Sequence, residues 1–314
     1  MRFRVAGAKS PRRKLSRADS RWSLMITENL YQHPSGPLSP NILSDNEYRL
    51  FRDLIYEECG ISLGAEKITF LESRLRRRMD ELGIKSGYEY HRLITTTQGR
   101  SQELPRLLDS LMICETSFFR NQPQFELLKE VVLPEIVARK EKAGTRLLRV
   151  WSAGCSTGQE PYSVVMTLLD SIPDRDSWTI RVFASDLSFT ALERAQTGLY
   201  REEQLKGVDA DSLARYFRQE KGHYLLNEAI RKRVIFDYHN LKHDNGLRGL
   251  DIVFCRNVMI YFDAFEQRRL VNRFSNCLVP GGFLFLGHAE SLQGLSPRFT
   301  MLHRNKGIAY RLER

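Results

Sequence analysis

The chain has 314 residues, of which 42% are apolar and 27% are charged. This composition is that of a folded globular protein and excludes a fully disordered or fibrous chain. No apolar run approaches the ~20 residues that a membrane-spanning helix needs, and no apolar signal core opens the chain, so we expect neither membrane insertion nor secretion. The five cysteines are widely spaced without a CxxC pair. We interpret them as free thiols in a reducing cytoplasm.

The formal net charge is +10, but it is concentrated at the N-terminus. Residues 1–24 hold eight Lys or Arg and one acid, whereas the other 290 residues carry only +3. The charge is therefore weak evidence for a nucleic-acid partner. Residues 1–40 combine these cations with Pro and Gly, and we expect a flexible basic tail there. A transit peptide, or an extension upstream of a start at Met25, would have a similar composition.

Residues 41–112 are predicted to form a small helical domain. Ser44 and Glu47 form a capping-box pattern, and apolar residues then recur at helical spacing until Gly60. Three further helices are expected near residues 65–82, 88–97 and 102–111.

Residues 113–314 are predicted to form an α/β domain. A helix at Gln124–Lys142 precedes alternating strands and helices, which favour a parallel sheet with helices on both faces. The polar segment at about 200–236 interrupts this alternation, and we expect a small inserted β subdomain there. Strands are expected at Leu147–Trp151, Ile180–Ala184, 234–238, 251–255 and 283–287, helices near 188–197 and 264–278, and a C-terminal hairpin of Phe299–Leu302 and Ile308–Leu312.

The stretch VWSAGCSTGQEPYS, Val150–Ser163, has the pattern of a strand, a small-residue turn and a helix. Ala153 and Gly154 lie in the turn, where small residues let the backbone approach a ligand closely. The free amides at the start of the helix add positive potential. No lysine of a phosphate-binding loop is present, which argues against nucleoside-triphosphate chemistry. A tight strand-to-helix connection without a ligand fits the same residues.

Polar residues end two further predicted strands. Asp186 follows VFAS, where an acid can accept hydrogen bonds from ribose hydroxyls, although it can also cap the next helix. Arg256 and Asn257 follow the apolar strand Ile252–Cys255. Because the carboxyl ends of parallel strands meet at one edge of a sheet, the pattern predicts a nucleoside-containing cofactor there.

The whole layout resembles the class I S-adenosylmethionine-dependent methyltransferases, with a Rossmann-like seven-stranded sheet and a C-terminal antiparallel hairpin. Three motifs in order make the resemblance specific: MICETSFFRN, STGQEPYS and CRNVMIYF. Together they resemble the CheR-type chemotaxis-receptor glutamate O-methyltransferases, over nearly all of residues 42–314. The resemblance implies methyl transfer from S-adenosylmethionine to glutamate carboxylates of chemoreceptor helices, which yields glutamyl methyl esters and S-adenosylhomocysteine.

The resemblance also implies roles for single residues. Arg120 and Tyr261 would flank the transferring methyl group as the catalytic pair. Glu160 would bind the methionyl or ribose end of the cofactor, and Asp186 the ribose. Cys114 stands where the family often has Asn. The implied cofactor-binding set is Cys114, Thr116, Arg120, Ala153, Gly154, Glu160, Asp186, Asn240, Leu241, Arg256 and Asn257.

The implied partner is the acidic helical bundle of a chemoreceptor's cytoplasmic part. A cluster of cations on one flank of the helix predicted over 65–82 suits docking of such a bundle, although an ordinary solvated face looks the same. The insertion looks short for the hairpin loop that grips a receptor tether peptide in some family members, so we expect a tether-independent, monomeric, cytoplasmic enzyme. The docking cluster is Lys67, Arg74, Arg77 and Arg78.

Two alternatives remain open from the sequence. A nucleic-acid methyltransferase would explain the net charge, but Arg256 to Tyr261 stand where enzymes that methylate base amines typically carry a Pro-Pro-aromatic motif. A non-catalytic sensor or scaffold that binds S-adenosylmethionine would keep the pocket, but the presence of Arg120 argues against it. His239 and His288 have no partners at metal-ligand spacing, so we expect no metal site.

Overall fold

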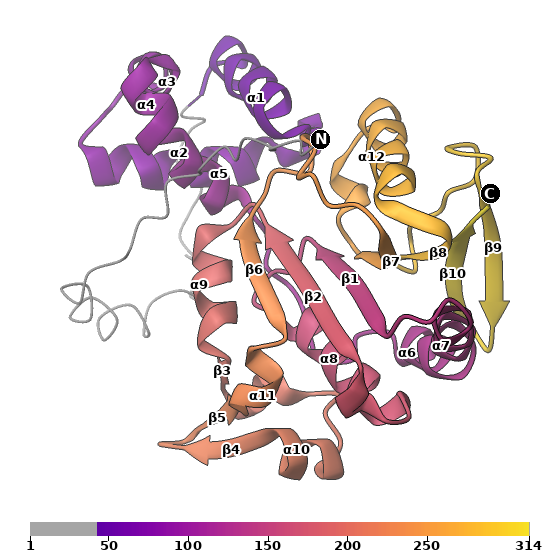
Figure 1. The fold of residues 1–314 in the computed structure, drawn as a ribbon. Coiled ribbons are helices and arrows are strands. Elements are labelled where there is room, and N and C mark those ends of the chain that lie inside the picture. Colours follow the sequence, from indigo (N-terminus) through magenta and orange to yellow (C-terminus); the bar gives the residue numbers. More distant parts are fainter. Residues whose placement is uncertain (1–42, 314) are drawn as a thin grey trace, which may run out of the picture. The chain divides into compact units, whose positions relative to one another are not determined.

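The computed structural model describes residues 43–313 (Figure 1). The predicted basic tail over residues 1–40 and the alternative start at Met25 lie outside them. No helix in the described part of the chain is both long enough and apolar enough to cross a membrane. The described residues comprise a helical part, residues 45–111, followed by an α/β part.

The helical part begins with a capped helix, as the sequence predicts. In α1 (Asp45–Cys59), the Ser44 hydroxyl accepts a hydrogen bond from the Glu47 amide at 3.3 Å, and the Glu47 carboxylate accepts one from the Ser44 amide at 2.9 Å. Gly60 ends the helix with a φ of 77°, which favours Gly. One apolar core holds this part together. The other helices are α2 (Ile68–Leu82), α3 (Gly87–Thr95), α4 (Thr97–Gln102) and α5 (Leu104–Leu111).

Seven strands form the main sheet: β1 (Leu147–Ala153), β2 (Thr179–Asp186), β6 (Val234–Tyr238), β7 (Leu250–Cys255), β8 (Leu278–Leu286), β9 (Phe299–Arg304) and β10 (Gly307–Leu312). Their order is β6-β2-β1-β7-β8-β10-β9. The first five strands in this order pair in parallel, and β10 is antiparallel to both β8 and β9. The predicted fold class, a seven-stranded sheet with a C-terminal antiparallel hairpin, is confirmed.

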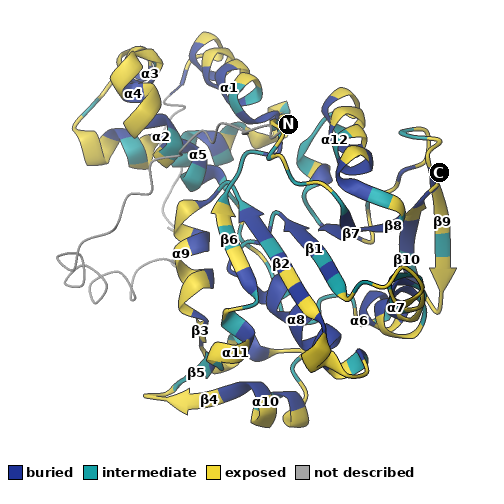
Figure 2. Ribbon diagram, in the orientation of Figure 1, coloured by how far each residue is buried: buried dark blue, intermediate teal, exposed yellow. Residues whose placement is uncertain are grey.

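Helices cover both faces of the sheet. Alternate side chains of a strand point to opposite faces, and apolar side chains on both faces are buried by these helices. Ile252 and Phe254 of β7 pack in one core with α8 (Gln159–Ser171). Val253 of the same strand packs in a second core with α12 (Ala264–Cys277). Figure 2 shows the consequence: the middle of the sheet is mostly buried and the outer sides of the helices are exposed.

The helix predicted over Gln124–Lys142 is interrupted in the structure. α6 (Gln122–Leu127) and α7 (Leu133–Lys142) flank a π-helical stretch, Leu128–Val132. Pro134 lies at the start of α7 and has no amide hydrogen for the preceding turn, so the wider π turn fits there.

A small antiparallel sheet precedes β6, as predicted for the insertion. Its strand order is β3-β5-β4. The hydroxyl of Tyr200 donates to the carbonyl of Thr157 at 2.9 Å, so the insertion is attached to the turn that follows β1. The α-helices and strands between β2 and β6 are α9 (Phe189–Thr197), β3 (Leu199–Tyr200), α10 (Ala210–Tyr216), β4 (Phe217–Glu220), β5 (His223–Leu226) and α11 (Glu228–Arg231).

Candidate active site

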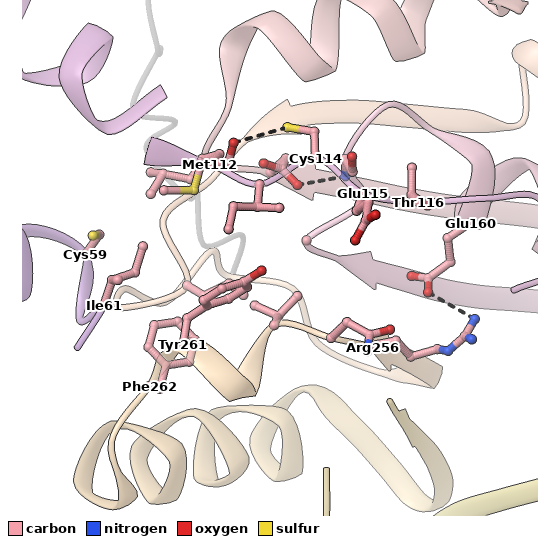
Figure 3. A pocket seen from close by; sticks show the side chains of 18 of the residues that line it. Cys59, Ile61, Met112, Cys114, Glu115, Thr116, Glu160, Arg256, Tyr261 and Phe262 are labelled. Atoms are coloured by element: carbon pink, nitrogen blue, oxygen red, sulfur yellow. Dashed lines mark hydrogen bonds and ion pairs between the residues drawn. The ribbon is translucent and has the colours of Figure 1, made fainter. Parts of the chain in front are cut away.

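The polar residues that end the parallel strands surround one cavity at the carboxyl edge of the sheet (Figure 3). Both predicted catalytic residues, Arg120 and Tyr261, line it. Ala153 does not line it, because its side chain is fully buried in the core shared with α12, so its place in the cofactor-binding set stays a prediction about its main chain. The other members of the predicted cofactor-binding set all line the cavity: Cys114, Thr116, Arg120, Gly154, Glu160, Asp186, Asn240, Leu241, Arg256 and Asn257.

The turn after β1 forms one wall from main-chain atoms. Gly154 has a φ of 84°, and a Cβ there would lie 2.4 Å from the Val258 side chain, so only Gly fits. Ser156 has a φ of 50°, an uncommon conformation for a residue with a side chain. The amides of Gly154 and Cys155 donate to the Ser185 carbonyl at 2.8 and 3.0 Å. The turn is therefore held against the end of β2.

Asp186 ends β2 and holds the same turn. Its carboxylate accepts hydrogen bonds from the amides of Ser156 at 2.7 Å and Ser188 at 2.9 Å. Burial raises the pKa of the Asp186 carboxyl, while these amides oppose the rise. The N-cap of α9 is Ser188, whose hydroxyl accepts from the Ala191 amide at 3.0 Å, so the capping alternative for Asp186 is wrong. The carboxylate keeps lone pairs for a further donor.

Glu160 and Arg256 form an ion pair at the cavity wall, drawn in Figure 3, with 3.4 Å between Oε2 and Nη1. The Ser152 hydroxyl donates to the other carboxylate oxygen at 2.7 Å. Burial raises the pKa of the Glu160 carboxyl, and Arg256 opposes the rise. Arg256 also donates to the main-chain carbonyl of Arg120 and lies over the Phe125 ring, 5.7 Å from its centroid. The pair holds a carboxylate at the cavity in one orientation.

Arg120 and Tyr261 reach the cavity from segments far apart in the chain. Arg120 lies between Phe119 and Asn121, which have φ values of 49° and 63°. A positive φ on both sides of Arg120 indicates a strained turn of the kind found at functional sites. The Arg120 guanidinium donates to the Glu115 carbonyl at 2.9 Å. Burial raises the pKa of the Tyr261 hydroxyl, opposed by the charge of Arg120, so the hydroxyl keeps its proton at neutral pH.

Glu290 holds the loop that follows β7, and the sequence analysis missed it. Its carboxylate accepts from the amides of Asn257 and Val258, both at 2.9 Å. It also accepts from the amides of Ile260 at 3.2 Å and Gly287 at 2.6 Å. These amides have no helix or strand partner, so the carboxylate satisfies them. No local pattern could have marked Glu290, because three of its four donors lie 30 to 33 residues away in the chain.

The end of α1 is bound to the loop after β6. The side-chain amide of Asn240 donates to the Glu58 carbonyl at 2.6 Å. The Lys242 ammonium donates to the Tyr56 carbonyl at 2.9 Å and to the Glu57 carbonyl. Terminal carbonyls of a helix have no partner within it, so these side chains supply donors to Glu57 and Glu58, while the Tyr56 carbonyl also accepts from the Gly60 amide at 2.9 Å. The nitrogen of the Asn240 side chain is thereby engaged within the protein.

This contact brings the helical part to the cavity. Cys59 and Ile61 line it, next to Tyr261 and Phe262 (Figure 3). The Ser62 amide donates to the Tyr261 carbonyl at 2.9 Å, and Ile61 pairs with Phe262 in an isolated antiparallel bridge. The sequence analysis missed this wall, because nothing near Cys59 indicates its distant neighbours.

Two family matches together cover most of the chain. Residues 46–112 match the family described as CheR methyltransferase, all-alpha domain, and residues 114–308 match CheR methyltransferase, SAM binding domain.

The chain belongs to the CheR methyltransferase family.

Relatives of this CheR methyltransferase match over most of their length. Chemotaxis protein methyltransferase 1 of Pseudomonas aeruginosa is 39% identical over 272 residues, which are 84% of this chain and 97% of the relative. The chemotaxis protein methyltransferase of Escherichia coli K12 is 38% identical over 268 residues, 82% of this chain and 89% of the relative. Among solved structures, the N-methyltransferase NodS from Bradyrhizobium japonicum with S-adenosyl-l-homocysteine has 12% identity, 62% and 95% coverage and a TM-score of 0.34. The family assignment rests on the sequence matches.

The SAM-binding domain of CheR methyltransferases implies S-adenosylmethionine, and the cavity fits it. Ser156 Oγ and His239 Nε2 are buried and find no hydrogen-bond partner in the part of the chain that the structure describes, and both residues line the cavity. Buried polar atoms are almost always paired, so these two indicate polar groups supplied by a ligand, as a base and a ribose would supply. Burial lowers the pKa of the His239 imidazole, which favours its neutral form. Within residues 43–313, no cluster of His, Cys, Asp and Glu is arranged to hold a metal ion.

The predicted cationic cluster on α2 is only partly exposed, which corrects the prediction. Arg78 donates to the Glu103 carboxylate at 2.8 and 2.9 Å, and only 12% of its side chain is exposed. The Tyr90 hydroxyl donates to the same carboxylate at 2.9 Å. Arg78 therefore belongs to a buried network, and Arg74 is half-buried. The sequence pattern of α2 alone could not show Glu103, which lies at the start of α5. The exposed members are Lys67 and Arg77.

Proposed function

We propose that this CheR methyltransferase transfers a methyl group from S-adenosylmethionine to glutamate side chains in the cytoplasmic helices of a chemoreceptor. The product would be a glutamyl methyl ester. The observation that carries the proposal is the joining, in one cavity, of the strand-end carboxylates with Arg120 and Tyr261.

We assign the cofactor to this cavity along the strand ends. Asp186 would accept hydrogen bonds from ribose hydroxyls, and Glu160 from donors at the methionyl or ribose end. Gly154 would let main chain approach the cofactor closely. Leu241 and the main chain of Asn240 would border the adenine, since the Asn240 side-chain amide is engaged by Glu58. Thr116 and Cys114, from the segment between α5 and α6, would cover the cofactor, and Arg256 and Asn257 would border its methionyl end.

The chain's own contribution to the reaction is alignment and exclusion of water. When bound, S-adenosylmethionine would supply a methyl group on a sulfonium, whose carbon a carboxylate oxygen can attack with S-adenosylhomocysteine as the leaving group and without any proton transfer. Glutamate is ionised at pH 7, so no general base is needed. The Tyr261 hydroxyl would donate to one acceptor oxygen and Arg120 would orient the carboxylate, and orientation of this kind contributes effective molarities of ~10⁵ M or more. Tight ion pairing with Arg120 would weaken the nucleophile, so its proposed role is positioning.

Transfer of labelled methyl groups to a panel of purified receptor cytoplasmic fragments tests the function. The wild type is expected to label glutamates of at least one fragment. Arg120→Ala and Tyr261→Phe are expected to lower kcat by about tenfold or more while changing the Kd for S-adenosylhomocysteine less. Arg194→Ala and Tyr88→Phe are matched controls, because both side chains are exposed and lie on other helices, α9 and α3. Unchanged turnover in both test variants would remove these residues from the mechanism.

We further propose a tether-independent, monomeric, cytoplasmic enzyme. β4 and β5 are joined by only two residues, Lys221 and Gly222, which supports the expectation of a short hairpin without room to grip a peptide. All five cysteines are free thiols, which supports a reducing compartment. The docking surface is reduced to the exposed cations Lys67 and Arg77. Titration with a receptor C-terminal peptide and sedimentation of the free protein test the first two statements, and binding of the peptide would contradict the first.

A further inference from the structure

A second cavity adjoins the one assigned to the cofactor. The two cavities share Arg120, Arg256 and Asn257. The second cavity therefore begins at the residues that border the proposed methionyl end of the cofactor, where the methyl group would be transferred. Its lining extends to His288 and Lys306, which belong to neither the cofactor set nor the catalytic pair. This position suggests a route to the reacting end that does not pass through the cofactor cavity.

The strand order explains where the second cavity lies. The cofactor cavity follows the carboxyl edge of the sheet across β6, β2, β1 and β7, which are neighbours in that order. The second cavity continues along the same edge: Arg256 and Asn257 follow β7, His288 follows β8, and Lys306 precedes β10. Since β10 is antiparallel to β8, its first residue lies at the carboxyl end of β8.

The fold holds Lys306 at this edge. It lies in the turn between β9 and β10 with a φ of 67°. A Cβ on the next residue, Gly307, would lie 2.4 Å from a main-chain oxygen at the start of α6, so the hairpin packs closely on that helix. Gln124 of α6 joins β8 and β10 by donating to the carbonyls of Leu286 at 2.7 Å and Ile308 at 3.0 Å.

The two cavities differ in charge. The cofactor cavity contains three carboxylates, those of Glu115, Glu160 and Asp186. The second cavity is lined by cations and by no carboxylate, and the structure of residues 43–313 gives Lys306 and His288 no hydrogen bond or ion pair. Acidic walls suit the sulfonium, amino and hydroxyl groups of a cofactor, and cationic walls suit an anion.

We propose that the second cavity admits the acceptor carboxylate, with Lys306 and His288 as outer contacts and Arg120 as the inner one. The ligand is the acidic side chain of a receptor helix, so this inference rests on the proposed function. Apart from Pro123, the residues that line the way to Arg120 are cationic or polar, and none is acidic. Entry past Glu115, Glu160 and Asp186 would bring the acceptor carboxylate against like charge.

Charge reversal of Lys306 tests the proposal. At low salt, Lys306→Glu is expected to raise the KM for a receptor fragment by about tenfold, and Lys306→Gln by less, because exposed charges act mainly on encounter and orientation. The Kd for S-adenosylhomocysteine is expected to stay unchanged. Rising salt should raise the wild-type KM and bring it closer to that of Lys306→Gln. His288→Gln is expected to raise the KM in the same direction.

Lys221→Glu is the matched control. Lys221 is also an exposed lysine in a two-residue hairpin turn, with a φ of 49°, but it lies between β4 and β5. Equal KM values for the Lys306→Glu and Lys221→Glu variants would overturn the proposal. A weakened Kd for S-adenosylhomocysteine with an unchanged receptor KM would overturn it too, since the cavity would then hold the cofactor's own carboxylate. Absence of methyl transfer by the wild type would instead overturn the proposed function.

Discussion

Replacement of Glu290 by Gln tests how the loop after β7 is held. Oε1 of the carboxylate accepts from the amides of Val258 and Ile260, and Oε2 from those of Asn257 and Gly287. In Gln one of these oxygens becomes an NH₂ group, which cannot accept. Two main-chain donors then lose their acceptor and face another donor.

The expected cost follows from these two donors. A partly buried amide without an acceptor costs about 1–3 kcal/mol, so for two amides the loss in the free energy of unfolding should be about 2–6 kcal/mol. For a chain of this size that corresponds to a decrease in Tm of about 3–9 °C. Tyr261 directly follows the held amides, so a looser loop also misplaces its hydroxyl. We expect kcat to fall by about tenfold to a hundredfold, more than the affinity for S-adenosylhomocysteine falls.

Differential scanning calorimetry, methyl-transfer kinetics and binding calorimetry on Glu290→Gln measure these three quantities. Glu126→Gln is the matched control, because Glu126 is exposed on α6 and its side chain makes no hydrogen bond within the described residues. Wild-type values of both Tm and kcat would refute the reasoning. A lowered Tm with an unchanged kcat would show that the loop's attachment serves stability and not the position of Tyr261.

Three further predictions concern other parts of the molecule. Arg78→Ala should destabilise the protein by about 2–4 kcal/mol in thermal unfolding, because it leaves the buried Glu103 carboxylate with only the exposed Arg106, 3.9 Å away, as a cation, whereas Arg77→Ala should change stability little; equal effects would contradict the buried network. Burial raises the pKa of the Asp186 carboxyl, and hydroxyl donors prefer its ionised form, so affinity for S-adenosylhomocysteine is complete above that raised pKa and lost as the pH falls through it; a calorimetric Kd that does not change with pH would argue against Asp186 as a ribose ligand. Burial also raises the pKa of the Cys114 thiol, so iodoacetamide should alkylate it slowly at neutral pH, faster as the pH rises, and more slowly still with S-adenosylhomocysteine bound, as followed by mass spectrometry; an alkylation rate unaffected by ligand would place the ligand elsewhere.

Much of the fold was predictable because its signals are local. Ser44 and Gly60 act within one turn of the helix ends that they determine, and both predictions are confirmed. The gathering of Asp186 and Arg256 at one edge was also predictable, since parallel strands bring their carboxyl ends together whatever the connections between them. Ala153 shows the limit of that rule: alternation along β1 directs its side chain into the core.

The features that the sequence did not reveal depend on distant partners. Arg78 looks like a surface cation until α5 brings Glu103 against it. The acceptor role of Glu290 appears only when β7 and β8 lie side by side. The π-helical stretch before Pro134 has a local cause, but helical periodicity alone does not distinguish it from a continuous α-helix.

The attachment of α1 to the loop after β6 limits how the two parts of this chain can be exchanged. Lys242 and Asn240 bind the last carbonyls of α1, and Ser62 binds the main chain of Tyr261. A fragment that lacks the helical part would lose a cavity wall. Asn240 and Lys242 would lose their acceptors, and the Tyr261 carbonyl would lose its donor. A chimera with the helical part of another protein would need a partner whose α1 ends at the same place, so a replacement of one part calls for a matching change in the other.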